Sequence, residues 1–188
     1  MRRSRAVGAI VGLTLLGLVI QVFAVQDSTA RAPTEIELEK ARQFVSQRKV
    51  VDTDGWLSVS KSSPGRWTLG DGFSSPEGDG AWMTSESARV EFLSPPGKTP
   101  TSVSLRLLPN VGPAKSSRTL VVYTSIDDQI HDLQGGTTDV TLALDGERRG
   151  LVTIKCDGLD RPADIGAGAD LRPLCVKLLA VRVTYDEQ

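Results

Sequence analysis

From Val50 onward the sequence alternates apolar and polar residues with a period of two, and this pattern limits the possible folds more than any other feature. Valine, leucine or phenylalanine alternates with charged or hydroxyl residues in segments 88–92, 102–107, 139–145 and 179–185. In the last segment the alternation predicts that Leu179, Val181 and Val183 face the core. Residues 120–123 are continuously apolar, which is typical of a central strand. Many short strands separated by turn formers predict an all-β, antiparallel β-sandwich (jelly-roll-like) over residues 50–188.

Composition and charge exclude several classes of protein. The first 25 residues hold three arginines and no acid, so the rest of the chain carries 19 basic and 23 acidic side chains, a net charge of −4. Nucleic-acid-binding proteins usually show a basic patch instead, so we expect no nucleic-acid partner. With one histidine and two cysteines there is little material for a protein-ligated zinc or iron site. We therefore expect no cofactor and no such metal centre.

Catalysis is also not expected. His131 is the only imidazole, so any Ser-His-Asp or Cys-His arrangement would have to use it. Its neighbours Ile130 and Asp132 indicate an ordinary strand position that faces outward. The sequence contains no phosphate-binding loop and no dinucleotide fingerprint after a strand. We predict that the protein is not an enzyme.

The amino terminus predicts export. Three arginines (Arg2, Arg3 and Arg5) precede the apolar run Ala6–Val25, which places the amino terminus inside and the rest outside the cytoplasm. Twenty residues at about 1.5 Å each reach about 30 Å, enough for a signal-anchor transmembrane helix within 1–25. Val22-Phe23-Ala24 instead fits a signal-peptidase site. The protein is thus either a single-pass cell-membrane protein or a secreted one.

A short linker and one helix are expected between this segment and the sandwich. Residues 26–33 are polar and end in proline. Thr34 lies three residues before Glu37, which is the spacing of a capping box. Apolar residues then recur at helical spacing, so 34–49 predicts a short amphipathic helix. That helix either packs on its own domain or binds a partner.

Cys156 and Cys175 are the only cysteines, and an oxidising compartment favours a disulfide between them. Two buried thiols are the alternative. Within the enclosed 157–174 loop lie four aspartates, which raise the question of a calcium ion: Asp157, Asp160, Asp164 and Asp170. Arg161 and Arg172 neutralise half of that charge, and the spacing matches no EF-hand loop. Aspartate is also a common turn former, so the sequence leaves the ion open.

Two segments together resemble a known family. The first, residues 72–83, reads GFSSPEGDGAWM, and the second, residues 164–174, reads DIGAGADLRPL. The pair is similar to the extracytoplasmic β-sandwich domain at the carboxyl end of many bacterial membrane glycosyltransferases. This chain departs from that family's pattern at Met83, Gly168 and Cys175, where the family often has serine or threonine, serine, and glycine. It also lacks the multi-spanning catalytic portion. The resemblance implies a carbohydrate-binding-module-like fold without catalysis of its own.

Sugar recognition needs an aromatic face and planar polar groups. The tryptophans available are Trp56, Trp67 and Trp82, and only Trp82 lies in one of the two motifs. We therefore predict a glycan-binding site at Glu77, Trp82, Asp170 and Arg172, where loops distant in sequence meet at one end of the sandwich. The alternative is that Trp82 belongs to the core and that Asp170 and Arg172 form a structural ion pair.

Two functions follow. The first is a membrane-anchored domain that binds cell-envelope polysaccharide. The second is a structural accessory subunit that docks on a membrane glycosyltransferase or another envelope protein. A glycan binder should expose a tryptophan in a loop-lined groove, whereas a docking subunit should bury all three tryptophans and expose an apolar patch.

Overall fold

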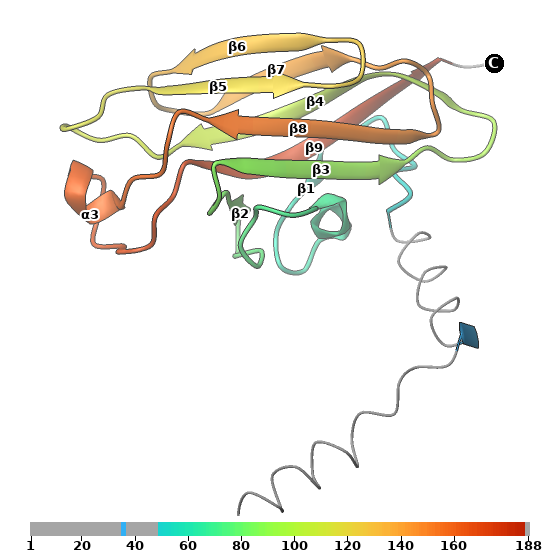
Figure 1. Ribbon diagram of the computed structural model, residues 1–188. Coiled ribbons are helices and arrows are strands. Elements are labelled where there is room, and N and C mark those ends of the chain that lie inside the picture. The colour runs from blue at the N-terminus through green and yellow to red at the C-terminus, as the bar shows by residue number, and fades with distance from the viewer. Residues whose placement is uncertain (1–34, 37–48, 187–188) are drawn as a thin grey trace, which may run out of the picture. The chain divides into compact units, whose positions relative to one another are not determined.

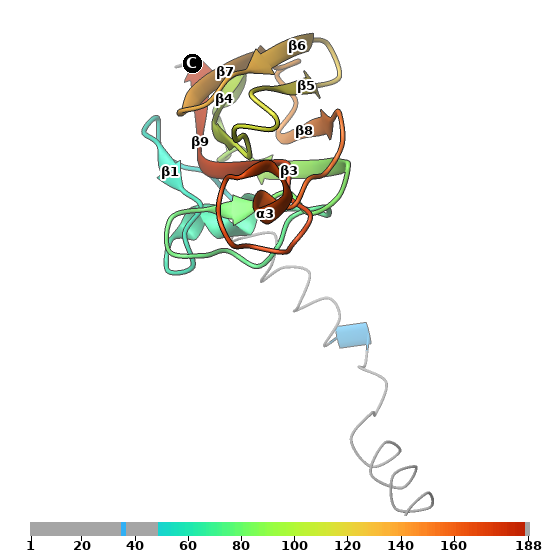
Figure 2. The same ribbon diagram turned by 90° about the vertical axis from the view of Figure 1, so that its left-hand side faces the viewer.

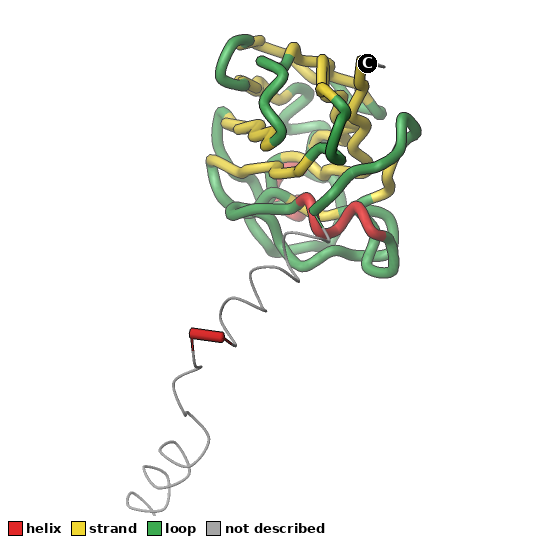
Figure 3. The backbone as a smooth tube through the Cα atoms, turned by 90° about the vertical axis from the view of Figure 1, so that its right-hand side faces the viewer, coloured by secondary structure: helices red, strands yellow, loops and turns green. Residues whose placement is uncertain are grey.

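The computed structural model of the protein describes residues 35–36 and 49–186 (Figure 1). The strands are β1 (Leu57–Ser58), β2 (Ala81–Trp82), β3 (Ser87–Leu93), β4 (Thr99–Pro109), β5 (Arg118–Tyr123), β6 (Asp128–Leu133), β7 (Thr138–Ala143), β8 (Arg149–Cys156) and β9 (Val176–Asp186). The short helices are η1 (Pro64–Thr68) and α3 (Pro162–Ile165). Figure 3 shows how little helix the sandwich contains.

Two antiparallel sheets form the sandwich. One has the order β1-β9-β4-β7, with β2 also paired to β9, and the other has the order β3-β8-β5-β6. The two layers are visible in Figures 1 and 2. Strands far apart in the sequence are neighbours in both sheets, as in Greek-key connections. The predicted all-β sandwich is confirmed, and β5, predicted to be a central strand, lies between β8 and β6.

The segments expected before the sandwich lie almost wholly outside the described residues. This holds for the 1–25 signal or anchor segment, for the 26–33 linker and for most of the predicted 34–49 helix. Glu35 and Ile36 are described and are helical, and Lys49 lies in a turn. No helix among the described residues is long and apolar enough to cross a membrane.

The core lies between the sheets and follows the alternation of the sequence. Val90 and Phe92 on β3 are fully buried, as are Val103 and Leu105 on β4. These side chains belong to one cluster that both sheets supply. Because successive side chains point to opposite faces of a strand, the polar residues between them face outward.

One part of the alternation prediction is wrong. The pairing of β4 with β9 shifts register between Arg106, opposite Ala180, and Leu107, opposite Leu178. At this irregularity Leu178, and not Leu179, faces the core: Leu178 is fully buried, whereas Leu179 is only partly buried. A bulge inserts an extra residue and reverses the alternation on one side of it. Val181 and Val183 remain in the core as predicted.

The β6–β7 edge of the sandwich is bridged by side chains. The Asp127 carboxylate accepts the N–H of Ala143 at 2.9 Å, and Gln129 Nε2 donates to the carbonyl of Thr141, also at 2.9 Å. The predicted outward position of His131 is wrong. His131 is half-buried on the same side of β6 as Leu133, and its Nε2 lies 3.0 Å from Gln129 Oε1. The apolar Ile130 takes the exposed position instead.

Candidate functional site

The first motif folds back on itself and adds a short strand to the edge of β9. Ser74 N–H donates to the Trp82 carbonyl at 2.7 Å, and Glu77 N–H donates to the Gly80 carbonyl at 2.7 Å. Strand β2 then pairs with β9, with Trp82 opposite Lys177. A Cβ on Gly80 would lie 2.5 Å from the backbone oxygen of Leu178. Glycine is therefore needed for the motif to lie this close to β9.

The second motif lies in the loop between β8 and β9, which a disulfide closes. Cys156 and Cys175 are bonded, with 6.5 Å between their Cα atoms, as the sequence predicted. Just inside the bridge, Asp160 and Leu174 form an antiparallel pair. Helix α3 follows and ends at Gly166, whose φ of 74° is the left-handed conformation of a helix C-cap. Figure 2 shows this loop at one end of the sandwich.

A buried arginine holds the base of the loop. The Arg118 side chain is fully buried, and its Nη2 lies 2.7 Å from Asp160 Oδ2. Its Nε donates to the carbonyl of Asn110 at 2.9 Å, and its Nη1 donates to that of Gly158 at 3.0 Å. Asn110 Nδ2 in turn donates to the Asp160 carbonyl at 2.8 Å. The guanidinium thus pairs with a carboxylate and with loop carbonyls, which compensates for the cost of burying its charge.

A chain of ion pairs joins the two motifs. Arg172 Nη2 lies 2.6 Å from Asp170 Oδ2 and 2.9 Å from Glu77 Oε1. On the other side of Glu77, Lys177 Nζ lies 3.2 Å from Oε2 and also contacts Asp79. Three of the four predicted site residues are therefore in direct contact, although they come from two loops.

Trp82 belongs to the same cluster. Lys177 Nζ lies 5.3 Å from the centroid of the Trp82 ring, within the range of a cation–π interaction. The ring is half-buried and lines a groove of about 320 Å³. Asp170 lines the same groove, together with residues from the end of β4 and from the α3 loop: Leu108, Pro109, Asn110, Val111, Pro162, Ala167, Gly168, Ala169 and Leu174. All four predicted residues therefore lie at one place, with Lys177 between Glu77 and Trp82.

The charges of the cluster lower the pKa values of its carboxyl groups. Burial would raise the pKa of Glu77, but hydrogen bonds from Arg172 and Lys177 outweigh burial and hold it below the usual 4.5. The hydrogen bond from the Arg172 side chain lowers the pKa of Asp170 below 3.8. The same contacts, first with Asp170 and then with Glu77, raise the pKa of Arg172. Both acids are therefore ionised at neutral pH.

We expect this cluster to contribute to stability above about pH 4.5 and to lose that contribution in acid. A carboxyl group with a lowered pKa stabilises the fold above its unfolded-state pKa, and the contribution disappears as the pH falls through the folded-state value. The difference in urea midpoint between about pH 7 and about pH 3 should therefore be smaller in Glu77→Gln than in the wild type. Glu86→Gln, which replaces an exposed glutamate, should keep the wild-type difference. An equal difference in Glu77→Gln and wild type would contradict this prediction.

The other two tryptophans lie elsewhere. Trp56 contacts the guanidinium groups of Arg106 and Arg182, which lie 4.2 and 4.9 Å from its ring centroid. Trp67 lines a separate hollow of about 550 Å³, together with Phe73. Both rings are half-buried, so none of the three tryptophans is a fully buried core residue.

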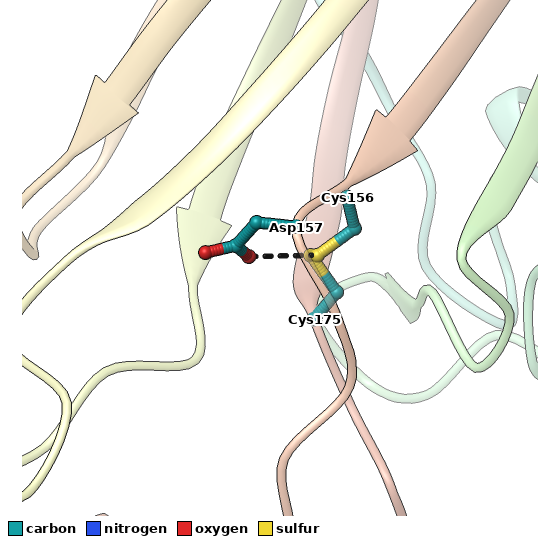
Figure 4. Close-up of side chains that lie close together, drawn as sticks. All are labelled: Cys156, Asp157 and Cys175. Atoms are coloured by element: carbon teal, nitrogen blue, oxygen red, sulfur yellow. Dashed lines mark hydrogen bonds between the residues drawn. A yellow bond between two sulfur atoms is a disulfide. The ribbon is translucent and has the colours of Figure 1, made fainter.

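The four loop aspartates do not gather around one point. Asp157 and Asp160 share Lys115, whose Nζ lies 3.2 Å from a carboxylate oxygen of each, and Asp170 pairs with Arg172. In the described part of the chain, the only group of three metal-ligand side chains is Cys156, Asp157 and Cys175 (Figure 4). Its two sulfur atoms form the disulfide, so they are not thiolate ligands.

The sequence prediction missed three residues that shape the site: Lys177, Arg118 and Asn110. One signal was present for Lys177, because a single cation between Val176 and Leu178 in an apolar strand needs a partner. Arg118 and Asn110 gave no such signal, since Arg118 follows the polar residues 115–117 at the start of β5, and Asn110 directly follows the end of β4. Their partners are mostly backbone carbonyls, whose positions depend on the folded loop.

Comparison with known proteins gives no family. No protein-family model matches the sequence, and no curated protein matches it either. Among solved structures, an active-site mutant of a family two carbohydrate esterase from Clostridium thermocellum is 10% identical, with a TM-score of 0.39, over 63% of this chain and 32% of that one. This chain thus spans about a third of the esterase.

Two carbohydrate-binding modules are also similar. The CBM36-1 domain of a multidomain xylanase from the hindgut metagenome of Trinervitermes trinervoides is 12% identical, with a TM-score of 0.36, over 62% of this chain and 84% of that one. A family 35 carbohydrate-binding module from an environmental isolate is 17% identical, with a TM-score of 0.31, over 63% and 76%. Similarities at this level do not assign a function, which has to be inferred from the contacts of the site.

Proposed function

We propose that this protein is a non-catalytic domain that binds a cell-envelope glycan in the groove beside Trp82. One observation carries the proposal: Trp82 from the first motif and Asp170 from the second line the same groove of about 320 Å³. Loops from two distant parts of the sequence thus place an aromatic ring and a carboxylate side by side. A tryptophan in a loop-lined groove is the feature that distinguishes a glycan binder from a docking subunit that buries its aromatic rings.

The lining of the groove suits a sugar. The half-buried side chains of Trp82 and Leu108 offer apolar contact for the C–H faces of a sugar ring, while Asp170 accepts hydrogen bonds from hydroxyl groups. The volume lies near the lower end of the range for small-molecule sites, about 300–1,000 Å³. Such a groove accommodates one or two sugar units rather than a long stretch of chain.

The proposed location is the outer side of the cell membrane. This part of the proposal is supported by the sequence, in which three arginines precede the apolar run of residues 6–25. An uncleaved segment would tether the sandwich to the membrane, and cleavage after Ala24 would release it. The resemblance of the two motifs to a domain of membrane glycosyltransferases supports a location near envelope polysaccharide.

A second candidate function is docking on a membrane glycosyltransferase or another envelope protein. Two large apolar side chains at the β5–β6 hairpin favour it, because Ile126 is 59% exposed and Ile130 is 73% exposed. A photo-crosslinking amino acid at position 130 of the intact, membrane-inserted protein should then capture one dominant partner. The same residue at exposed position 86 serves as the control, and capture of the same proteins from both positions would count against docking.

Replacement of Trp82 should weaken glycan binding without unfolding the protein. The test titrates the full-length chain in detergent with neutral oligosaccharides of glucose, xylose, arabinose, galactose or mannose. Tryptophan fluorescence follows binding to the wild type, and calorimetry measures the affinity of the wild type and of the variants, because the Trp82 variants lack the ring that reports binding. Loss of the ring in Trp82→Ala should lower affinity about five- to tenfold, or about 1–1.4 kcal/mol. Trp82→Phe, which keeps an aromatic face, should stay within about twofold of wild type.

The matched control is Trp56→Phe, because Trp56 lies against Arg106 and Arg182 and does not line this groove. Its affinity should equal that of the wild type. The absence of a fluorescence change with every oligosaccharide would remove the main support for glycan binding. If Trp82→Ala loses cooperative unfolding, the ring belongs to the core and not to a ligand site.

A further inference from the structure

A second hollow lies at the other end of the sandwich from the α3 loop. It has a volume of about 480 Å³ and is formed by the end of β5, the β7–β8 turn and the start of β8. Figure 1 shows this end of β5 and β8 on the opposite side from α3. Strand β8 runs from Arg149 beside this hollow to Cys156 at the base of the α3 loop. Eight residues at about 3.3 Å each separate the two sites by roughly 20–25 Å.

The hollow has an aromatic and apolar floor. Tyr123 at the end of β5 is half-buried and pairs with Thr153 of β8. Lys155 Nζ lies 5.4 Å from the centroid of the tyrosine ring and so restricts its orientation. Leu151, two residues before Thr153 on the same face of β8, is 43% exposed. A flat ring beside an open apolar side chain is suited to the C–H face of a sugar.

The rim of the hollow supplies polar groups of both kinds. The Ser125 hydroxyl donates to Asp145, and the backbone N–H of Glu147 donates to the same carboxylate at 3.0 Å. Among the described residues, the Glu147 side chain makes no hydrogen bond or ion pair. The Arg149 side chain is 70% exposed, and its Nη2 lies 3.7 Å from Glu91 Oε2. The Glu147 carboxylate can therefore accept, and the Arg149 guanidinium can donate, further hydrogen bonds at the rim, and a ligand rich in hydroxyl groups needs both.

We propose that this hollow is a second glycan-binding site and that the domain is bivalent. The ligand class rests on the function proposed above, and the site residues are Tyr123, Glu147 and Leu151. Two carboxylates, Asp145 and Glu147, outweigh the single guanidinium of Arg149 at the rim. That balance favours a neutral sugar over a uronic acid or a phosphorylated one.

Two sites at opposite ends hold two stretches of polysaccharide at once. When both sites engage one polymer, the second binding event is intramolecular and the overall affinity exceeds that of either site, commonly by about 10²–10⁴-fold. A short oligosaccharide that cannot span roughly 20–25 Å gains nothing from this effect. Bivalency therefore predicts a large difference between polymer and oligosaccharide that a single groove does not produce.

The experiment is calorimetric titration of the full-length chain in detergent with trisaccharides of glucose, xylose, arabinose, galactose and mannose. The wild type should bind two equivalents. Tyr123→Ala and Trp82→Ala should each weaken one of these two equivalents about five- to tenfold and leave the other unchanged, and the double variant should weaken both. Wild type should also bind the matching immobilised polysaccharide at least about tenfold more tightly than either single variant.

The outcomes separate the two proposals. One equivalent in the wild type that Trp82→Ala weakens and Tyr123→Ala leaves unchanged would overturn bivalency and keep the proposed function. One equivalent with the opposite pattern would support the second site and overturn the groove at Trp82. No binding by the wild type to any of the five trisaccharides would overturn both.

A milder pair of variants guards against misfolding. Glu147→Gln removes one charge at an exposed rim position and should lower affinity at the second site about three- to tenfold. Glu86→Gln makes the same change at an exposed position that does not line either site, and it should bind like the wild type. Equal binding by Glu147→Gln and Glu86→Gln, together with full binding by a folded Tyr123→Ala, would overturn the second site.

Discussion

Removal of the Cys156–Cys175 disulfide is expected to lower the free energy of unfolding by about 3 kcal/mol. The bridge joins residues 19 positions apart, and a cross-link of this size reduces the entropy of the unfolded chain by roughly that amount. The variant to test is Cys156→Ala/Cys175→Ala, because Cys175 is fully buried and a serine there would add a buried hydroxyl. Denaturant unfolding of the oxidised wild type and of the variant measures the difference.

The wild type under a strong reductant provides the matched comparison. Its unfolding midpoint should move most of the way to that of the double alanine variant, since both lack the cross-link. If the oxidised wild type and the double alanine variant have the same denaturant midpoint, the disulfide does not stabilise the fold, and the contacts of Arg118 hold the loop without it. The variant should also bind glycan more weakly, because Ala167–Asp170 and Leu174 line the groove from within the closed loop.

Replacement of Arg118 is expected to have a similar effect, about 2–4 kcal/mol, because at least two loop carbonyls lose their hydrogen-bond donor. Arg118→Met keeps most of the apolar volume but leaves Asp160 without its buried partner, at 2.7 Å in the wild type. It also leaves the carbonyls of Asn110 and Gly158 without their hydrogen-bond donor. Lys115 still contacts Asp160, so the remaining carboxylate keeps one cation. The free energy of unfolding in urea measures the loss.

Arg161→Met is the matched control in the same loop. Arg161 is exposed, so its replacement should change stability by less than about 0.5 kcal/mol. Arg118→Lys should recover only part of the loss, because an ammonium group lacks the planar fork that reaches Asn110, Gly158 and Asp160 together. If Arg118→Met unfolds at the same urea midpoint as the wild type, the buried Arg118 side chain does not contribute to stability.

The sandwich could be predicted because its signal is local. Alternation along β3 and β4 depends only on neighbouring residues, so the sequence predicts strands with one apolar face in segments 88–92 and 102–107, and their residues Val90, Phe92, Val103 and Leu105 lie in the core. The exception at Leu179 has a physical reason. A bulge changes which residue faces the core, and its position depends on the register with β4, which the sequence of β9 alone does not contain.

The candidate site could be predicted only in part. Glu77 and Arg172 could be predicted because the two motifs that contain them together resemble a known domain, and the structure joins them at 2.9 Å. Lys177, which contacts Glu77 and Trp82, was missed, since its partners are fixed by the pairing of β2 with β9 and not by nearby sequence. Arg118 was missed because it binds the backbone carbonyls of Asn110 and Gly158, and every residue has a carbonyl, so the sequence does not show which of them a side chain will bind. Contacts that depend on the pairing of distant strands, such as those of Lys177 and Arg118, can be found only in the structure.

The side chains that bridge β6 and β7 have a consequence for solubility. An unpaired strand edge presents free N–H and C=O groups, which another chain can use to extend the sheet into an aggregate. Asp127 and Gln129 occupy the Ala143 N–H and the Thr141 carbonyl on the open edge of β7. Many copies of the domain crowded on one surface can therefore stay separate, since this edge has no vacant hydrogen bonds at those positions for a neighbour to capture.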